Sequence, residues 1–508
     1  MEIMKKRTIA LTLCVCLLMG LFTGCGKTKD GQTSAKTRDD LVVILPNDFT
    51  TLDPQMLPAS ADINFCANIF DGLVEVDPDT KEIKPSLAES WDISDDGMSY
   101  TFHLKKGVKF HNEDEMKASD VVYTCKRFAE QAWMQFASFM IQDSEAVDDY
   151  TVKINLKYPY ANFLGEISYM YVTSEKYMNE AGDKAAKNPI GTGAYKFVKW
   201  DVSQQIVLEA NKDYFAGAPS IKKLTFKIIP DSNTAFVALE KGEADLNFNV
   251  SAVDYNQAKE NPDLETDEVV GNSYYAANFN SDRVDEKVRQ ALAYAIDKEA
   301  VNVLVNEGQG VVTDIPLEKG QEGYADKSEY TTYAYDVEKS KKLLAEAGAK
   351  DLKLDFFYGE STANGKLAQA LQSMFSEVGV TLELKPVETG TWWQMFGDGD
   401  YDMSRGGYPM EDVNTDAPYF DMYHKDGTFN VSRINDPDIN NLLEQARVEM
   451  DADKRDKMYV EVQKIIMEKA YVIPLYFNLS TVVYNPALKN VKAIHNQKYI
   501  YKNMSWKE

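Results

Sequence analysis

The sequence alternates amphipathic helices with short strands from Leu41 to Trp506, and no Pro-, Gly- or Ser-rich linker interrupts it. Apolar residues at helical spacing predict helices over residues 332–348 and 363–379, each ended by a glycine, and a third helix over 288–305. Residues 380–386 (VTLELKP) alternate as a strand. This alternation indicates an α/β architecture.

The length of the chain, 508 residues, favours more than one domain. The sequence contains no internal repeat and no linker at which one domain would end. We therefore expect the chain to cross between two lobes more than once.

The first 24 residues have the parts of a secretory signal. Basic residues at positions 5–7 precede an apolar run over 9–22, which is shorter than the roughly 20 residues of a membrane-spanning helix. The ending Phe-Thr-Gly-Cys resembles a bacterial lipobox, in which Cys25 would carry lipid and become the first mature residue. An uncleaved anchor helix and a plain secretory signal are the alternatives. Residues 25–40 begin with a polar stretch without apolar pattern and are predicted to form a flexible tether.

The charge of the chain excludes some partners. The formal net charge is −25, and because residues 1–24 carry three cations and one anion, their removal leaves −27. So acidic a surface disfavours DNA, RNA and anionic lipid, and gives a weak attraction for cationic ligands. We expect no nucleic-acid partner, and contact with the membrane only through the lipid on Cys25.

The cysteines indicate no metal site. Two of the five leave with the signal and Cys25 takes lipid, so Cys66 and Cys125 remain. No close-spaced Cys/His pattern of a zinc site occurs. We expect two small buried residues, and a disulfide between them stays open at this point.

A search for catalytic motifs finds none. The stretch GTGAYKF (191–197) lacks the spacing of a phosphate loop, and residues 198–211 after it are predicted to be strand rather than helix. The four histidines do not pair at the spacing of a zinc protease, and no Gly-x-Ser-x-Gly elbow occurs. The acidic stretch DGDYD (398–402) lacks the EF-hand pattern. We therefore expect binding without catalysis and no cofactor.

Residues 68–124, NIFDGLVEVDPDTKEIKPSLAESWDISDDGMSYTFHLKKGVKFHNEDEMKASDVVYT, carry a resemblance. They are similar to the extracellular solute-binding proteins of peptide-type ABC transporters, the oligopeptide- and dipeptide-binding family. Shorter matches follow in the family's order: LDPQ (52–55), NPIGTGAYKF (188–197), DSNTAFVALEKGEADL (231–246) and VRQALAYAIDKEAV (288–301). Within the long block, apolar residues at strand spacing are predicted to be core: Trp91, Tyr100, Phe102, Leu104, Val108 and Phe110.

The resemblance implies a two-lobed periplasmic-binding-protein fold of type II, in the peptide-binding class with an extra inserted domain and a ligand cleft between the lobes. Lobe I would comprise residues 41–70, 191–271 and 478–508, with residues 71–190 inserted on it. Lobe II would run from 272 to 477. The two crossings, near residues 269–280 and 474–480, would form a hinge that closes on ligand.

The resemblance also implies the ligand site. The segment YDMSRGGYPMED (401–412) resembles the cleft segment in which an arginine, a Gly-aromatic pair and an acid face the ligand. Glu411 is the first choice for the acid that binds a peptide ammonium, Asp412 the second and Asp416 the third. Tyr408 would supply an aromatic wall, and Arg405 could receive a peptide carboxylate. Further expected cleft residues are Asn47, Phe49, Thr50, Tyr274, Tyr275, Asn278, Trp392 and Trp393.

The implied function is that of a monomeric substrate-binding lipoprotein that delivers extracellular peptides to an ABC permease and its ATPase subunits. Dipeptide binders of the family carry an arginine near the stretch that here reads FFYGESTANG (356–365), where none occurs. This favours longer peptides or another solute. An oligosaccharide, a nickel chelate, and a different class altogether, a surface adhesin or signalling receptor, remain alternatives.

Overall fold

The computed structural model describes residues 38–56, 65–77, 80–130, 138–410, 414–496 and 498–507. The predicted signal (1–24), Cys25 and most of the tether lie outside the described residues, as do Glu411 and Asp412. None of the helices described is long and apolar enough to cross a membrane.

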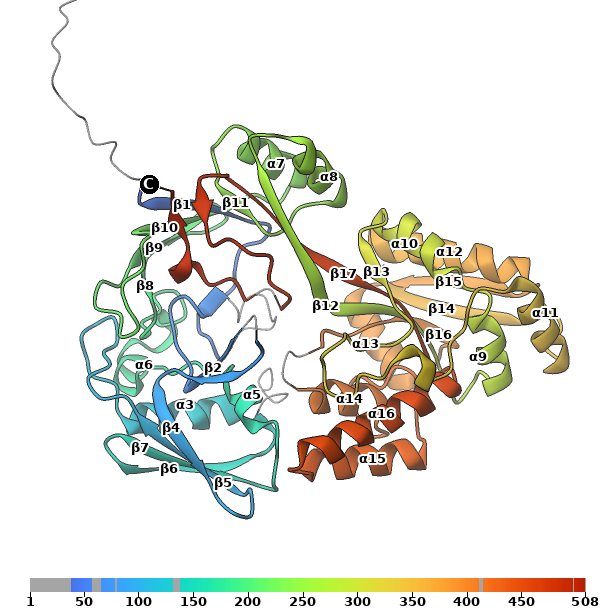
Figure 1. Cartoon of the computed structure of the whole chain (residues 1–508), viewed down its shortest axis with the longest axis horizontal. Helices are drawn as coiled ribbons and strands as arrows, with labels where there is room; N and C mark the ends of the chain where they lie inside the picture. The colour runs from blue at the N-terminus through green and yellow to red at the C-terminus, as the bar shows by residue number, and fades with distance from the viewer. Residues whose placement is uncertain are drawn as a thin grey trace, which may run out of the picture. The chain divides into compact units, whose positions relative to one another are not determined.

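The largest sheet in the described part of the chain has eleven strands (Figure 1). In spatial order these are β15 (Thr381–Val387), β14 (Lys353–Gly359), β16 (Met403–Gly406), β12 (Glu265–Phe279), β17 (Val472–Tyr484), β11 (Leu246–Asn247), β1 (Asp40–Leu45), β10 (Lys223–Ile228), β9 (Gln205–Ala210) and β8 (Tyr195–Asp201), with β13 (Gly310–Val312) also paired to β17.

Strands β12 and β17 are the two long members of this sheet and run antiparallel side by side (Figure 1). The first part of β12, up to Val270, pairs with residues 479–484 of β17, and the part from Tyr274 onwards pairs with residues 472–477. The register shifts between Val270 and Tyr274. Strand β11 joins β17 near the first part of the ladder, whereas β16 joins β12 at the second part. The pair therefore links two groups of strands, with an irregularity between them.

Residues 74–184 form separate, smaller elements. A four-stranded sheet has the order β4 (Ala88–Ile93), β5 (Ser99–Leu104), β7 (Thr151–Leu156) and β6 (Ile141–Asp148), and β2 (Val74–Val76) pairs with β3 (Ile83–Pro85). The helices here are α3 (Ala118–Glu130), α5 (Phe163–Ile167), α6 (Glu175–Ala181) and η2 (Gly182–Lys184). The core prediction for this block is confirmed, with Tyr100, Phe102, Leu104, Val108 and Phe110 at most 3% exposed and Trp91 half-buried.

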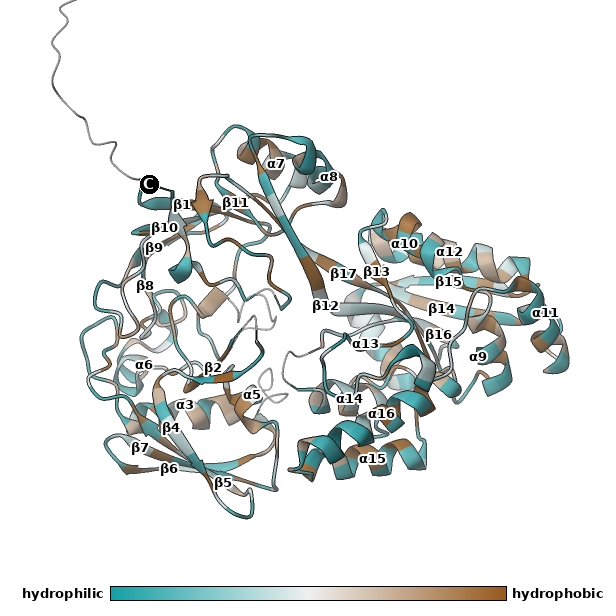
Figure 2. Cartoon of the chain, in the orientation of Figure 1, coloured by the Kyte–Doolittle hydropathy of each residue, from teal (hydrophilic) through white to brown (hydrophobic). Residues whose placement is uncertain are grey.

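The remaining elements include α7 (Ser232–Glu240), α8 (Ala252–Glu260), α9 (Glu286–Ala293), α10 (Lys298–Asn306), η3 (Lys327–Glu329), α11 (Val337–Glu346), α12 (Thr362–Glu377), α13 (Thr389–Asp398), α14 (Asp416–Tyr423), α15 (Pro437–Val448), α16 (Ala452–Glu468), β18 (Leu488–Lys489), η4 (Tyr501–Asn503) and β19 (Ser505–Trp506). Helices α15 and α16 carry long hydrophilic stretches, whereas β12 and β17 include hydrophobic ones (Figure 2).

One prediction of a single element was wrong. The helix expected over 288–305 is two helices, because the Asp297 side chain accepts a hydrogen bond from Ala300 N and starts α10 anew. The prediction of strand rather than helix over 198–211 is confirmed, although two strands, β8 and β9, form a hairpin there with Ser203 at φ +59° in the turn. The helix stop at Gly379 is confirmed by its positive φ of +83°.

The stretch 191–197 has a structural reason for its glycines. A Cβ on Gly191 would lie 2.1 Å from the Ile69 carbonyl oxygen, and one on Gly193 would lie 2.4 Å from the Ile69 carbonyl carbon. Gly193 N donates to that Ile69 oxygen at 2.9 Å. His111 accepts from Gly191 N through Nδ1 and donates from Nε2 to Gly193 O, and burial lowers its pKa to about 4. The glycines thus permit close backbone packing.

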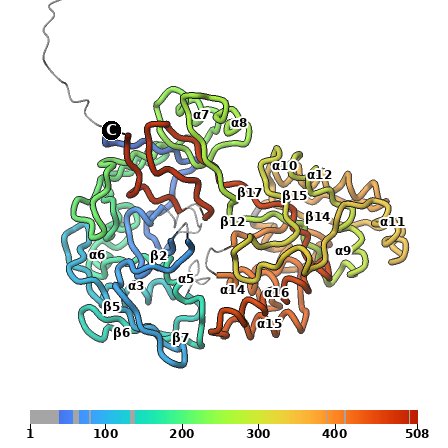
Figure 3. Tube along the Cα trace, in the orientation of Figure 1, coloured from blue at the N-terminus to red at the C-terminus, as the bar shows by residue number. Residues whose placement is uncertain are grey.

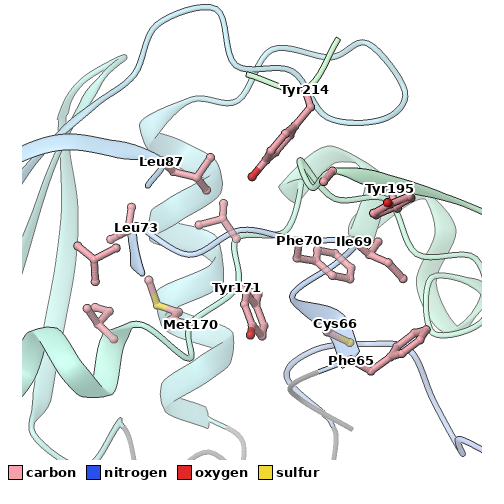
Figure 4. Close-up of a cluster of buried hydrophobic side chains, with 14 of the residues drawn as sticks. Phe65, Cys66, Ile69, Phe70, Leu73, Leu87, Met170, Tyr171, Tyr195 and Tyr214 are labelled. Atoms are coloured by element: carbon pink, nitrogen blue, oxygen red, sulfur yellow. The ribbon is translucent and has the colours of Figure 1, made fainter. Parts of the chain in front are cut away.

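This packing borders a hydrophobic core that includes residues from distant parts of the chain. Figure 4 shows Phe65, Cys66, Ile69 and Phe70 beside Tyr171 and Tyr195. Cys66 and Cys125 are both buried and no disulfide joins them, which settles the open question in favour of thiols. The C-terminal segment, red in Figure 3, returns to the N-terminal part of the described chain. There Trp506 Nε1 donates to Asp40 O at 2.8 Å.

Candidate functional site

The two glycines of the segment 401–412 bring it against β12. Strand β16 pairs with β12 so that Arg405 lies opposite Ala277 and Gly406 opposite Ala276. A Cβ on Gly406 would lie 1.9 Å from Asn278 Oδ1, and one on Gly407, at φ +122°, would lie 2.1 Å from the Tyr274 carbonyl oxygen. Any larger residue would push the segment away from β12. Beyond the glycines, Pro409 bridges to Ser273 and Met410 N donates to Asn272 O at 2.7 Å.

Arg405 stacks on an aromatic column. Its guanidinium lies 4.5 Å from the centre of the Tyr275 ring, and Tyr275 stacks on Tyr476 at 5.0 Å between centres. The side chain is half-buried. Among the described residues no carboxylate or other acceptor reaches the guanidinium, and its Nε is buried without an acceptor. A partly desolvated cation without an anion is costly, so this place favours an anionic group.

Five aromatic rings form what we call the aromatic wall: Trp392, Trp393, Phe396, Tyr408 and Phe429. Trp392 packs on Trp393 at 4.9 Å and stacks on Phe396 at 5.4 Å. Phe429 lies 5.5 Å from Trp393 and 5.2 Å from Tyr408, so it joins α13 to the predicted segment. Trp393 is 47% exposed, which leaves its ring available to a ligand.

Some residues of the aromatic wall or its surroundings were not predicted, among them Asp421, Phe429 and Arg433. The Arg433 guanidinium donates to the carbonyls of Phe396 (3.0 Å) and Gly397 (2.7 Å) at the C-terminal end of α13. Tyr408 OH lies 3.4 Å from Asp421 Oδ2, and burial raises the pKa of that carboxyl. Phe429 and Arg433 lie in a loop without periodic pattern, so no sequence signal pointed to them.

Of the three predicted acids, the structure describes only Asp416, because Glu411 and Asp412 lie outside the described residues. Asp416 is the first residue of α14 and is fully buried. Its Oδ2 lies 2.9 Å from Arg447 Nε, and Tyr459 OH donates to its Oδ1 at 3.2 Å. Burial raises the pKa of Asp416, and the Arg447 cation opposes that rise. Both oxygens are engaged inside the protein, so a ligand would have to displace one of these partners.

The other predicted residues divide between surface and core. Asn47 and Thr50 are exposed, and Phe49 is half-buried against Phe65 at 4.6 Å. Tyr274 is buried, with its OH 3.0 Å from Tyr423 OH, which gives it a packing role. Asn278 is 8% exposed and its Oδ1 has no hydrogen-bond partner among the described residues.

A cavity of about 1130 Å³ lies along the register shift of β12 and β17. Its walls include Val270 and Phe477 from these strands, Lys327 from η3, His495 and Lys502. His495 Nδ1 lies 3.1 Å from Glu318 Oε2, and Lys327 Nζ lies 2.6 Å from Asp314 Oδ2. None of the predicted ligand residues lines this cavity. Within the residues described, no group of three or more His, Cys, Asp or Glu side chains could hold a metal ion.

Comparison with known proteins identifies the class. Residues 82–430 match the family described as bacterial extracellular solute-binding proteins, family 5, and the chain belongs to this family. The heme-binding protein A of Haemophilus influenzae is 30% identical over 83% of this chain and 84% of its own length. The oligopeptide-binding protein AppA of Bacillus subtilis is 29% identical over 93% of this chain and 94% of its own length.

A solved structure gives the same fold. The periplasmic binding protein DppA of Helicobacter pylori, in complex with the peptide STSA, superposes with a TM-score of 0.80 at 27% identity, over 93% of this chain and 99% of that one. The predicted α/β, two-lobed periplasmic-binding-protein fold of the peptide-binding class is therefore confirmed. Family members bind solutes, which also confirms the prediction that the chain is not an enzyme.

Proposed function

We propose that the chain is the substrate-binding protein of an ABC importer and captures extracellular peptides with free termini. The observation that carries this proposal is the half-buried Arg405, stacked on Tyr275 without an anionic partner among the described residues. A peptide carboxylate supplies the planar acceptor that a guanidinium binds through two hydrogen bonds.

The rest of the site fits an extended peptide. The exposed Trp393 and the half-buried Tyr408 offer ring faces to side chains. Glu411, with Asp412 as a second acid, is proposed to hold the peptide ammonium. Asn47, Phe49 and Thr50, which follow β1, are proposed to contribute from the other lobe.

The proposed division into lobes follows the sheet. Residues 41–70, 191–271 and 478–508 would form lobe I, residues 71–190 the inserted domain and residues 272–477 lobe II. The register shift of β12 between Val270 and Tyr274 supports a hinge there. Cys25 is proposed to carry lipid and to hold a monomeric protein at the outer face of the cell membrane, where it delivers peptide to a permease and its ATPase subunits. Cys25→Ser should then release the protein into the medium.

A second solute class has an observation in its favour. Exposed aromatic rings such as Trp393 also bind sugar rings, so an oligosaccharide is the alternative. The relative from Haemophilus influenzae is named a heme-binding protein, and haem, which carries carboxylates, is a further alternative.

Native mass spectrometry of freshly purified protein, followed by calorimetry, tests the proposal. We expect co-purified masses that fit peptides, and binding of a synthetic pool of peptides of two to nine residues. Maltooligosaccharides, haem and nickel–histidine serve as competing probes. Binding of one of these without any peptide binding would overturn the peptide proposal.

A further inference from the structure

Side chains from residues 139–166 meet side chains from residues 414–447 in a buried group that we call the Asn414 seam. It comprises Phe139, Tyr160, Asn162 and Glu166 on one side and Asn414 and Arg447 on the other. The first set belongs to the proposed inserted domain and the second to proposed lobe II. The seam therefore joins a part of the chain that precedes β12 in the sequence to a part that follows it.

Asn414 is the centre of the seam. Its Nδ2 donates to Tyr160 OH at 3.1 Å and to Glu166 Oε1, and its Oδ1 accepts from Asn162 Nδ2 at 2.9 Å. The same Oδ1 accepts from Asp416 N at 2.8 Å and so holds the first turn of α14. Glu166 is 1% exposed and Asn414 is 3% exposed, so these bonds are shielded from water.

Arg447 extends the seam. Its guanidinium lies 3.5 Å from the Phe420 ring of α14 and 4.9 Å from the Phe139 ring. It also binds Asp416, so the Phe139 ring covers an ion pair that lies wholly within proposed lobe II. When the two sides separate, Arg447 and Asp416 keep each other, whereas the Phe139 ring and the hydrogen bonds of Tyr158 with Arg447 and of Tyr160 with Asp416 are lost.

The chemistry of the seam suits repeated opening. When amide, carboxylate and hydroxyl groups separate, water replaces their hydrogen bonds at a small net cost in free energy. An apolar interface of the same area would cost more to separate. The register shift of β12 between Val270 and Tyr274 offers a place for the accompanying rotation.

We propose that Glu166 is a positioning residue for solute binding, which holds Asn414 and thereby the start of α14 in the ligand-bound arrangement of the two sides. Glu166 acts on the solute at least through Asn414, which it contacts directly. This inference rests on the proposed function, because it concerns the same cleft. It predicts that loss of the seam speeds release of solute, since the two sides must part before the solute can leave.

The test compares the wild type with the double variant Asn162→Ala/Glu166→Gln and with the control Glu145→Gln, which changes an exposed acid on β6. The probe is tetra-alanine, with association and dissociation rates measured by stopped flow. We expect about tenfold faster dissociation in the double variant, as the loss of the buried Asn162–Asn414 hydrogen bond implies. The control should behave as the wild type. Small-angle scattering without peptide should give a larger radius of gyration for the double variant.

The outcomes separate this inference from the proposed function. If the wild type binds tetra-alanine and the double variant releases it at the wild-type rate, the positioning role is wrong. If the wild type binds neither tetra-alanine nor the peptide pool, the peptide proposal is wrong. The scattering comparison then decides whether the seam holds the two sides together, and equal radii of gyration for the wild type and the double variant would overturn that role. If the double variant does not fold, Glu166→Gln alone decides, and an unchanged dissociation rate for it overturns the inference.

Discussion

Arg405 and Arg447 lie in two regions of the molecule that use the same stacking contact to different ends. Arg405 stacks on Tyr275 at 4.5 Å, and Arg447 stacks on Phe420 at 3.5 Å. Arg447 has its own carboxylate, Asp416, at 2.9 Å. Arg405 has no such partner among the described residues, although the chain carries 80 acidic residues.

The difference shows that an acidic chain can hold one stacked guanidinium with a carboxylate and another with none among the described residues. An aromatic face holds the guanidinium without neutralising it. Where a carboxylate also binds the guanidinium, as Asp416 binds Arg447, the result is a structural ion pair. A stacked guanidinium without a carboxylate can still bind an anion. The predictions below test whether Arg447 acts on folding and Arg405 on binding.

Loss of Arg447 should have the largest effect. Arg447→Ala leaves Asp416 buried without its cation, and the free energy of unfolding should fall by about 3–5 kcal/mol. Urea denaturation measures this. Arg447→Met combined with Asp416→Leu should recover part of the loss, because the apolar pair needs no counter-charge while the buried Tyr459 OH loses its acceptor. A double variant as unstable as Arg447→Ala would show that the loss comes from packing rather than from charge.

Low pH should lower the free energy of unfolding through His111, whose two ring nitrogens are hydrogen-bonded inside the protein. Its pKa is about 4 in the fold, against 6.5 for a free histidine, so the unfolded chain binds the additional proton between these values. The stability from neutral His111 is present above pH 6.5 and is lost as the pH falls towards 4, by about 3 kcal/mol in all. His111→Asn should flatten urea midpoints across this window. A wild-type slope retained in the variant would contradict the assignment.

Loss of Arg405 should act on binding. Arg405→Gln should weaken tetra-alanine binding by about 2–5 kcal/mol, or roughly thirty-fold and more, while the urea midpoint changes little. Arg283→Gln is the matched control, because Arg283 is an exposed arginine already paired with Asp400 and Asp402. C-terminally amidated tetra-alanine should bind the wild type as weakly as free tetra-alanine binds Arg405→Gln. Equal binding of the two peptides by the wild type would show that Arg405 receives no carboxylate.

The opposite end of the peptide gives a comparable test. Glu411→Gln with Asp412→Asn should weaken tetra-alanine binding by roughly thirty-fold or more, since a desolvated charge pair loses one partner. N-acetylated tetra-alanine should bind the wild type about as weakly. If the acetylated and free peptides bind equally well, the acids do not hold an ammonium and a neutral solute becomes the leading alternative.

Much of the fold could be predicted from local pattern. The alternation of Tyr100, Phe102 and Leu104 gave a buried strand face, and Gly379 gave the end of α12, because both signals lie within a few residues. The break at Asp297 was missed because the apolar spacing of residues 288–305 continues through it. The partner strands of β12 lie up to some 200 residues away along the chain, so their order could not follow from spacing.

The site could be predicted only in part for the same reason. The segment 401–412 was identifiable because its arginine, glycines and tyrosine are adjacent. Whether an acid can bind a ligand depends on cations that lie elsewhere in the sequence. Asp416 is already paired with Arg447, which belongs to α15. The close approach of Asn278 explains why residue 406 is a glycine. The two residues lie far apart in the sequence, so their contact could not be predicted from it.

The smallest expected effect separates the two tryptophans of α13. Trp393 is 47% exposed and touches Trp392 and Phe429, whereas Trp392 is half-buried between Phe357 and Phe396. Trp393→Ala should weaken binding of a tetrapeptide that contains phenylalanine by about 0.5–1.5 kcal/mol and leave tetra-alanine unaffected. Trp392→Ala should instead lower the urea midpoint, because it removes a packed ring. Calorimetry with both peptides measures the difference. An equal loss for both peptides in Trp393→Ala would mean that the ring shapes the cleft rather than receives a side chain, and a loss confined to maltooligosaccharides would favour the sugar alternative.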